Sequence, residues 1–198
     1  MSRPAVFARL VALSAPVLLA VTAACSTGFP LPPAGLVVDT GTVTLWALNG
    51  TDLVHPSAYD VVLQTVARTD RTSAFDFAFD VRVDTAPPHD TVAVCLPRGT
   101  LGLYVDGGLQ VTTQPFDAIT LAPPSGYQDT VAVPVQVGTV VLAASRSQTC
   151  NFGYIKPLYA KIQVTAVDLV ERSITFRIFT DPNCGYRSLR ADSLPPSE

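Results

Sequence analysis

The chain has 198 residues, with 13 Lys and Arg, 16 Asp and Glu, and a net charge of −3. This mildly acidic balance excludes the broad basic surface by which proteins hold nucleic acid. Fourteen of the acids are Asp, and 17 Pro and 12 Gly accompany them, a composition that favours turns over helices. The sequence therefore predicts a β protein without a nucleic-acid partner.

The first 24 residues have the order of an export signal. Arg3 and Arg9 supply positive charge without any acid, residues 10–21 are almost entirely apolar, and small residues follow. These three parts correspond to the n-region, the h-region and the cleavage site of a signal peptide. The apolar part is also shorter than the ~20 residues that a membrane-spanning helix needs. We expect residues 1–24 to be a signal peptide that is removed.

The signal ends in Thr22-Ala23-Ala24-Cys25, which resembles the lipobox of bacterial lipoproteins. In that family the cysteine thiol is lipidated and the signal is cut just before it. The resemblance implies a lipid-modified Cys25, export to the bacterial cell envelope and a membrane anchor made of acyl chains such as palmitate. Ser26 after the cysteine resembles the outer-membrane members. The alternative is an ordinary signal peptide cut near Ala24.

The rest of the chain is predicted to be one domain between two tails. Residues 25–35 are rich in Pro and Gly and form the expected tether, while residues 190–198 have nothing to bury and form the expected disordered tail. Cleavage before Cys25 would leave 11 basic and 16 acidic residues, a net charge of −5. The length between the tails, residues 36–189, suits a single domain with a substantial core.

Short β-strand patterns separated by turn signals fill this domain. Asn49-Gly50 and Asp106-Gly107-Gly108 are typical hairpin turns. Residues 57–68 have helical as well as strand spacing, but their β-branched content favours a strand. The expected strands cover residues 36–48, 57–68, 75–84, 91–96, 100–105, 109–113, 116–121, 130–135, 139–144, 159–169 and 174–180. Such a series predicts an antiparallel β-sandwich, Ig-like or similar, with a partly closed barrel as the alternative.

The clearest strand pattern is that of residues 75–84, in which aromatic and aliphatic residues alternate with polar ones. The alternation predicts one buried face and one solvated face. Asp76, Asp80 and Asp84 would then lie on the solvated face. At ~3.4 Å per residue, carboxylates four positions apart start about 13 Å from each other, too far to share one calcium ion.

Three cysteines follow the signal, in a compartment where thiols oxidise. Cys150 and Cys184 lie in turn-like sequence beside Asn and Gly, whereas Cys95 lies inside an expected strand. We therefore expect a Cys150–Cys184 disulfide, with a bridge to Cys95 as the alternative. Tyr154 and Tyr186 lie close to the two turn cysteines in the sequence. They form either a candidate binding patch or a layer that packs over the disulfide.

Residues that could carry chemistry are few and scattered. His55 and His89 each adjoin a proline, Glu171 lies in a turn, and no catalytic, phosphate-binding or metal-ligand motif is present. The sequence thus predicts no enzyme, no cofactor and no metal. It indicates a structural or binding module whose partner is an envelope protein or a glycan. An envelope hydrolase that uses carboxylates or a metal is the alternative, and a carrier with an apolar cavity is a third hypothesis.

Overall fold

The structure is a computed structural model that describes residue 31 and residues 33–36, 40–83, 88, 90–104, 106–150 and 153–190. All of these described residues belong to one compact unit of the chain. The predictions for the signal peptide, for the acylated Cys25, for Asp84 and His89 and for the tail after residue 190 lie outside the described residues.

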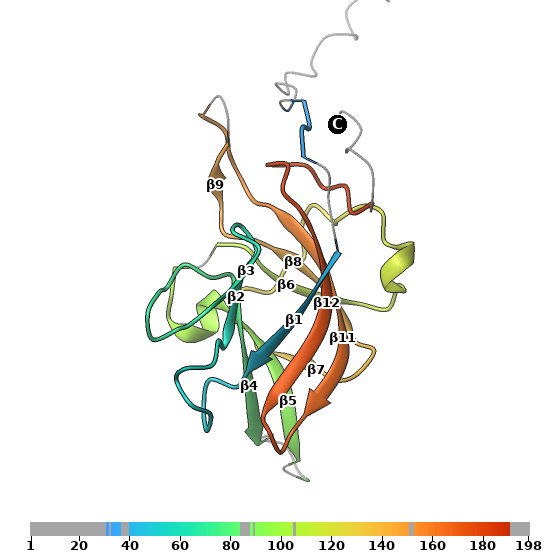
Figure 1. Ribbon diagram of the computed structural model, residues 1–198. Helices are drawn as coiled ribbons and strands as arrows, with labels where there is room; N and C mark the ends of the chain where they lie inside the picture. The colour runs from blue at the N-terminus through green and yellow to red at the C-terminus, as the bar shows by residue number, and fades with distance from the viewer. Residues whose placement is uncertain are drawn as a thin grey trace, which may run out of the picture. The chain divides into compact units, whose positions relative to one another are not determined.

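Two five-stranded antiparallel sheets make up the described domain (Figure 1). Sheet A has the spatial order β1 (Thr40–Trp46), β12 (Ser173–Asp181), β11 (Tyr159–Asp168), β8 (Val140–Ala144) and β6 (Gly108–Thr112). Sheet B has the order β3 (Thr65–Ala67), β2 (Ala58–Asp60), β4 (Phe77–Val83), β5 (Thr91–Pro97) and β7 (Val133–Val135). Neither sheet closes on itself, so the β-sandwich prediction is confirmed and the barrel alternative is wrong.

The main core lies between the sheets. Inward-facing side chains of β4 and β5 meet those of β8, β11 and β12 in one cluster, in which Phe79 and Phe176 are almost completely buried. The ring centroids of Tyr59 and Phe77 are 5.8 Å apart, and those of Phe77 and Phe176 are 6.0 Å apart. These separations suit favourable aromatic pairs, so the two sheets are joined chiefly by apolar contact.

Parts of the outer faces of both sheets are covered as well. On sheet A, the alternate residues Leu142 and Phe179 form a second cluster with Phe116 from a short helix and Leu189 from the segment after β12. On sheet B, a third cluster includes Ala78 and is covered by residues that follow β5. Part of each outer face is therefore buried as well, and there alternation along a strand does not separate core from solvent.

Two expected strands are short 3₁₀ helices instead. Residues 100–105 and 116–121 were expected to pair in a sheet, but the chain forms η1 (Arg98–Leu101) and η2 (Phe116–Ala118) there. Each helix follows a proline, which lacks the N–H that a central strand must donate. These segments supply the outer covers of sheets B and A.

The other strand predictions differ from the structure mainly in extent. Residues 57–68 form the short strands β2 and β3, with Gln64 in a left-handed conformation (φ 53°) in the turn between them. Only residues 133–135 of the expected strand 130–135 are a strand. The hairpin of β9 (Gln148–Thr149) and β10 (Ile155–Lys156) was not expected from the sequence.

The prediction that Asp76 and Asp80 face solvent is wrong. Their exposed fractions are 4% and 1%, because the outer side of β4 is covered and both carboxylates have hydrogen-bond donors. Asp80 accepts hydrogen bonds from the backbone N–H of Asn49 (3.2 Å), from Asn49 Nδ2 (2.8 Å) and from Arg82 Nε (3.1 Å). Asp80 thus holds the predicted Asn49-Gly50 turn against sheet B.

Candidate functional site

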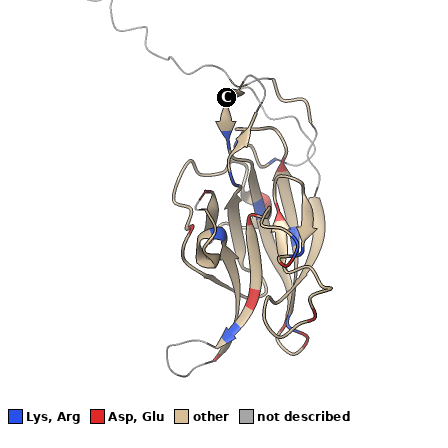
Figure 2. Cartoon of the chain, turned by 90° about the vertical axis from the view of Figure 1, so that its left-hand side faces the viewer, with Lys and Arg blue, Asp and Glu red and all other residues tan. Residues whose placement is uncertain are grey.

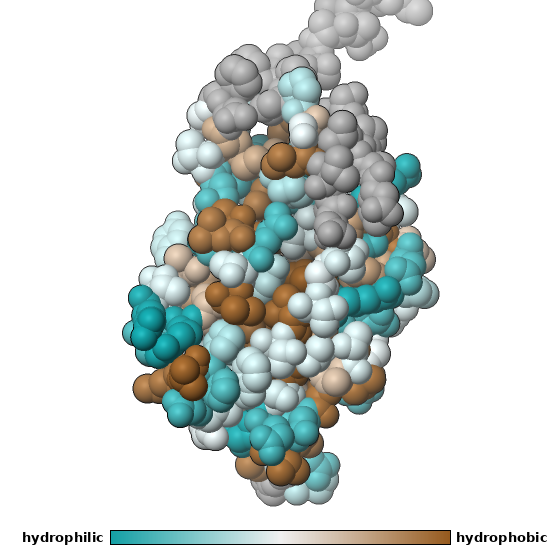
Figure 3. All heavy atoms as spheres, viewed as in Figure 1, coloured by the Kyte–Doolittle hydropathy of each residue, from teal (hydrophilic) through white to brown (hydrophobic). Residues whose placement is uncertain are grey.

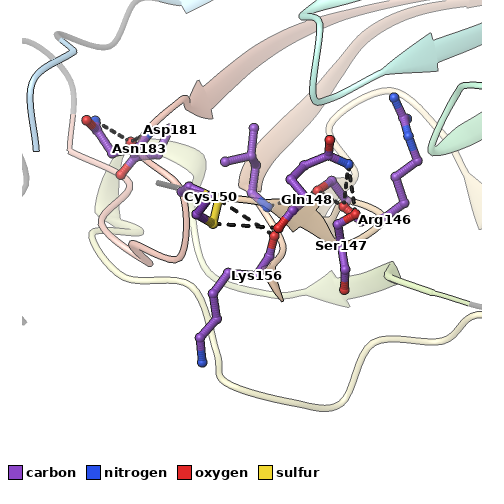
Figure 4. Close-up of a disulfide and its surroundings, with 10 residues drawn as sticks. Arg146, Ser147, Gln148, Cys150, Lys156, Asp181 and Asn183 are labelled. Atoms are coloured by element: carbon purple, nitrogen blue, oxygen red, sulfur yellow. Dashed lines mark hydrogen bonds between the residues drawn. A yellow bond between two sulfur atoms is a disulfide. The ribbon is translucent and has the colours of Figure 1, made fainter. Parts of the chain in front are cut away.

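The candidate site lies around the disulfide, where Cys150 and Cys184 are joined as the sequence favours (Figure 4). Their Cα atoms are 5.8 Å apart, a usual separation for a bridged pair. Cys95 is a free cysteine buried in the core between the sheets. Burial raises the pKa of the Cys95 thiol to about 12, which leaves it inert as a nucleophile.

A hollow of about 500 Å³ lies beside the disulfide. Both cysteines line it, together with Val62 from the β2–β3 turn, Gln148 from β9 and Leu158 just before β11. Its size falls within the roughly 300–1,000 Å³ of small-ligand pockets. Figure 4 shows the β9 segment beside the disulfide, where Gln148 Nε2 donates to the carbonyl oxygens of Arg146 (3.2 Å) and Ser147 (3.0 Å).

Asn183 holds the backbone of the segment that precedes β1 at the edge of the same hollow. Its Oδ1 accepts the backbone N–H of Gly35 (3.0 Å) and of Leu36 (3.1 Å), and its Nδ2 donates to the Leu36 carbonyl (2.9 Å). Asp181 orients the Asn183 side chain by accepting a second hydrogen bond from Nδ2 (2.7 Å). Gly35, Leu36 and Asn183 all line the hollow, so the hollow lies where the chain enters the domain.

The two candidate tyrosines differ in burial and in whether they line the hollow. Tyr186 lines the hollow and is 2% exposed, so it contributes mostly packing. Tyr154 is half-buried and is not part of the lining. Its backbone carbonyl accepts the Cys150 N–H, which fastens the β9–β10 hairpin to the disulfide. Tyr186 is thus buried beside the hollow and Tyr154 is partly exposed on the hairpin, and their role in binding stays a prediction.

The hollow has a neutral lining. Among the described residues that line it, none is Asp, Glu, Lys, Arg or His. The polar side chains of the lining are the amides of Gln148 and Asn183 and the hydroxyls of Thr149 and Tyr186. Proline, leucine and valine side chains supply apolar surface. This surface can hold an uncharged group through van der Waals contact and hydrogen bonds.

An ionic cluster that sequence reasoning missed joins the two sheets near this site. The Arg146 guanidinium lies 2.8 Å from Asp60 Oδ2 and 3.1 Å from Asp76 Oδ2. Asp76 also accepts the backbone N–H of Arg146 (2.7 Å) and of Val61 (2.7 Å). Burial raises the pKa of Asp76, and the hydrogen bonds and charge of Arg146 oppose that rise. Arg146 follows β8 of sheet A and Asp60 lies in β2 of sheet B, so the cluster is a brace between the sheets. Neither aspartate lines the hollow.

The remaining candidates lie apart from the hollow. His55 is exposed and stacks on Trp46, with ring centroids 4.6 Å apart. Glu171 is exposed in the β11–β12 turn, where its N–H bonds Asp168. Within the described ranges, no three His, Cys, Asp or Glu side chains lie close enough to hold a metal ion. The described part of the chain also has no helix with the length and apolar character to cross a membrane.

No known protein family matches the sequence, and comparison with curated proteins finds none that is significantly similar.

Proposed function

We propose that the chain is a lipid-anchored binding module of the bacterial cell envelope, attached to the outer membrane through Cys25. Its partner would bind at the disulfide-braced hollow. One observation carries the proposal: the hollow is at the point where the chain enters the domain, held there by Asn183. Gly35 is ten residues from Cys25, and an extended chain of that length spans at most about 36 Å. An anchor at Cys25 would therefore keep the hollow close to the membrane surface.

The neutral lining limits the chemistry of the partner. A hollow of about 500 Å³ without a charged side chain among its described lining residues suits an uncharged sugar or an uncharged loop of a neighbouring protein. Amide side chains can hydrogen-bond hydroxyl or peptide groups, and the apolar residues can pack against a ring face. We assign no catalytic residue and no cofactor to this site.

Photocrosslinking from two positions tests the proposal. A photoreactive residue at Thr149, which lines the hollow and is exposed, should capture an envelope glycan or protein in living cells. The matched control is Val170, which is 89% exposed in the β11–β12 turn and is not part of the hollow. A probe at Val170 should give no such product.

The salt dependence of capture separates this site from a charged one. Capture at Thr149 should persist at about 0.5 M salt, where charge interactions are screened within a few ångströms. Equal capture at Thr149 and Val170, or none at either position, would contradict a binding role for the hollow.

A further inference from the structure

A second hollow, on the outer face of sheet A, surrounds a buried lysine. Lys161 of β11 is 4% exposed, and its Nζ donates to the carbonyl of Ile119 (2.9 Å). The same Nζ lies 4.7 Å from the ring centroid of Phe116 and 5.1 Å from that of Phe179. Within the described part of the chain, no carboxylate oxygen lies within 4.0 Å of Lys161 Nζ. Buried ammonium groups usually have an anionic partner.

A second cation shares the Phe116 ring. The Arg177 guanidinium of β12 lies 4.0 Å from the ring centroid. Its Nε donates to Gln163 (2.7 Å), and its NH2 group forms an ion pair with Asp117 (2.9 Å). Figure 1 shows η2, which carries Phe116 and Asp117, beside β11 and β12. Asp117 balances only one of these two cations.

Both cations line a hollow of about 350 Å³, which Arg190 also lines. Asp117 is the one acid among the described residues of this lining, so its three cations leave an excess of positive charge. Phe116, Ile119, Phe179 and Leu189 supply an apolar wall. The volume is near the lower end of small-ligand pockets, which suits a molecule with few heavy atoms.

We propose that this hollow binds a small organic anion with an apolar body, whose carboxylate interacts with Lys161 and Arg177. The apolar body would contact the phenylalanine rings. Desolvation lowers the pKa of Lys161, and the neighbouring Arg177 lowers it further while Asp117 raises it. A bound carboxylate would favour the charged form of Lys161 and supply the anionic partner that the described contacts lack.

Calorimetry with benzoate tests the proposal on the full folded chain. Benzoate should bind the wild-type protein, and the neutral isostere benzamide should bind at least about tenfold more weakly, since its amide lacks the charge that strengthens these hydrogen bonds. Inorganic phosphate, which has no apolar body, should also bind more weakly than benzoate. Benzamide binding as tightly as benzoate, or no benzoate binding, would overturn the proposal.

Two lysine variants test whether Lys161 is the residue that binds the carboxylate. Lys161→Met should weaken benzoate binding at least about tenfold, because it removes the charge and keeps most of the volume. Its thermal midpoint should be no lower than that of the wild type, because an unpaired buried charge has been removed. The matched control Lys156→Met changes the chain's other lysine, which is exposed on β10, and should leave binding unchanged. Unchanged binding in Lys161→Met would overturn the assignment.

Arg177→Gln provides a second readout if Lys161→Met does not fold, and it should also weaken benzoate binding at least about tenfold. The sequence after Arg190 carries Asp192, so Asp192→Asn tests whether the chain itself supplies the anion. Benzoate binding that appears only in Asp192→Asn would assign the cations to the chain's own carboxylate and overturn the proposal.

Discussion

At the scale of single residues, Arg146 is the side chain that supplies the counter-charge for two of the buried aspartates, Asp60 and Asp76. Its guanidinium bridges Asp60 of β2 and Asp76, just before β4, from a position that follows β8 of sheet A. The two aspartates are almost completely buried. Buried carboxylates are tolerated when an opposite charge and hydrogen bonds accompany them. Removing Arg146 would leave two acids facing each other without a counter-charge.

We expect Arg146→Met to lower the free energy of unfolding at pH 7 by about 3–5 kcal/mol, the usual loss when one partner of a buried ion pair is removed. Urea unfolding followed by fluorescence measures this change. The control Arg82→Met removes a half-exposed partner of Asp80 and should cost at most about 1 kcal/mol. Equal losses of unfolding free energy in the two variants would contradict a special stabilising role for Arg146.

The same variant should respond to pH in a defined direction. Burial already raises the pKa of Asp76 in the folded protein, and Arg146 opposes that rise, so the variant's pKa should be higher still. An acid whose folded pKa is above its unfolded value binds its proton more readily when folded. The variant should therefore regain stability as the pH falls through the folded pKa of Asp76 towards the unfolded value near 3.8. Stability that falls steadily over this window would contradict the explanation.

At the scale of elements, the strands with strong local patterns could be predicted and the covering segments could not. β4, β5, β8, β11 and β12 lie within the expected ranges to within a residue or two. The segments at η1 and η2 have strand-like composition, but their preceding prolines and their contacts with outer sheet faces decide their conformation. Those contacts are long-range, and no local pattern contains them.

The candidate site shows the same division. The disulfide could be predicted because both cysteines lie in turn sequence. The other features of the site join residues that are far apart in the chain: the hollow, the Arg146 brace and the hydrogen bond between Asn183 and Leu36. The last two residues are 147 positions apart. The alternation in β4 indicated a solvated row of aspartates, and only the covered outer face explains why Asp76 and Asp80 are buried.

The disulfide should stabilise the hollow by closing a loop. Cys150 and Cys184 are 34 positions apart, for which the chain-entropy relation gives about 3–4 kcal/mol. The double variant Cys150→Ser and Cys184→Ser should lose that amount of unfolding free energy in urea titrations. Dithiothreitol should destabilise the wild type similarly and leave the double variant unchanged. A crosslinked peptide that contains Cys95 in non-reducing peptide maps would contradict the pairing.

At the scale of the whole molecule, the described domain offers few broad surfaces for a partner. Loops and short helices cover apolar parts of the outer faces of both sheets. The apolar residues exposed on the face in Figure 3 lie in separate patches among polar ones. Figure 2 shows charged residues scattered over the described strands and loops, without a broad basic stripe. Recognition is therefore expected at the hollows, and this supports the proposed binding role.

The proposed anchor predicts how the protein behaves in a bacterial cell. The wild type should incorporate labelled palmitate and sediment with membranes, because two or more acyl chains give a stable membrane attachment. Cys25→Ala should show neither property. Cys95→Ala is the matched control, since Cys95 is buried, and it should remain labelled. A soluble, unlabelled wild-type protein would reject the lipoprotein proposal.

The hold of Asn183 on Gly35 and Leu36 also has a mechanical consequence. If the domain is tethered at Cys25 while a partner holds it, tension reaches it through the chain ahead of Gly35. Asn183 resists that tension first, through three hydrogen bonds. It adjoins Cys184, whose bond to Cys150 spreads the force across a covalently closed loop. Peeling of β1 from β12, which would open sheet A at its edge, should therefore begin only after the bonds to Asn183 have broken.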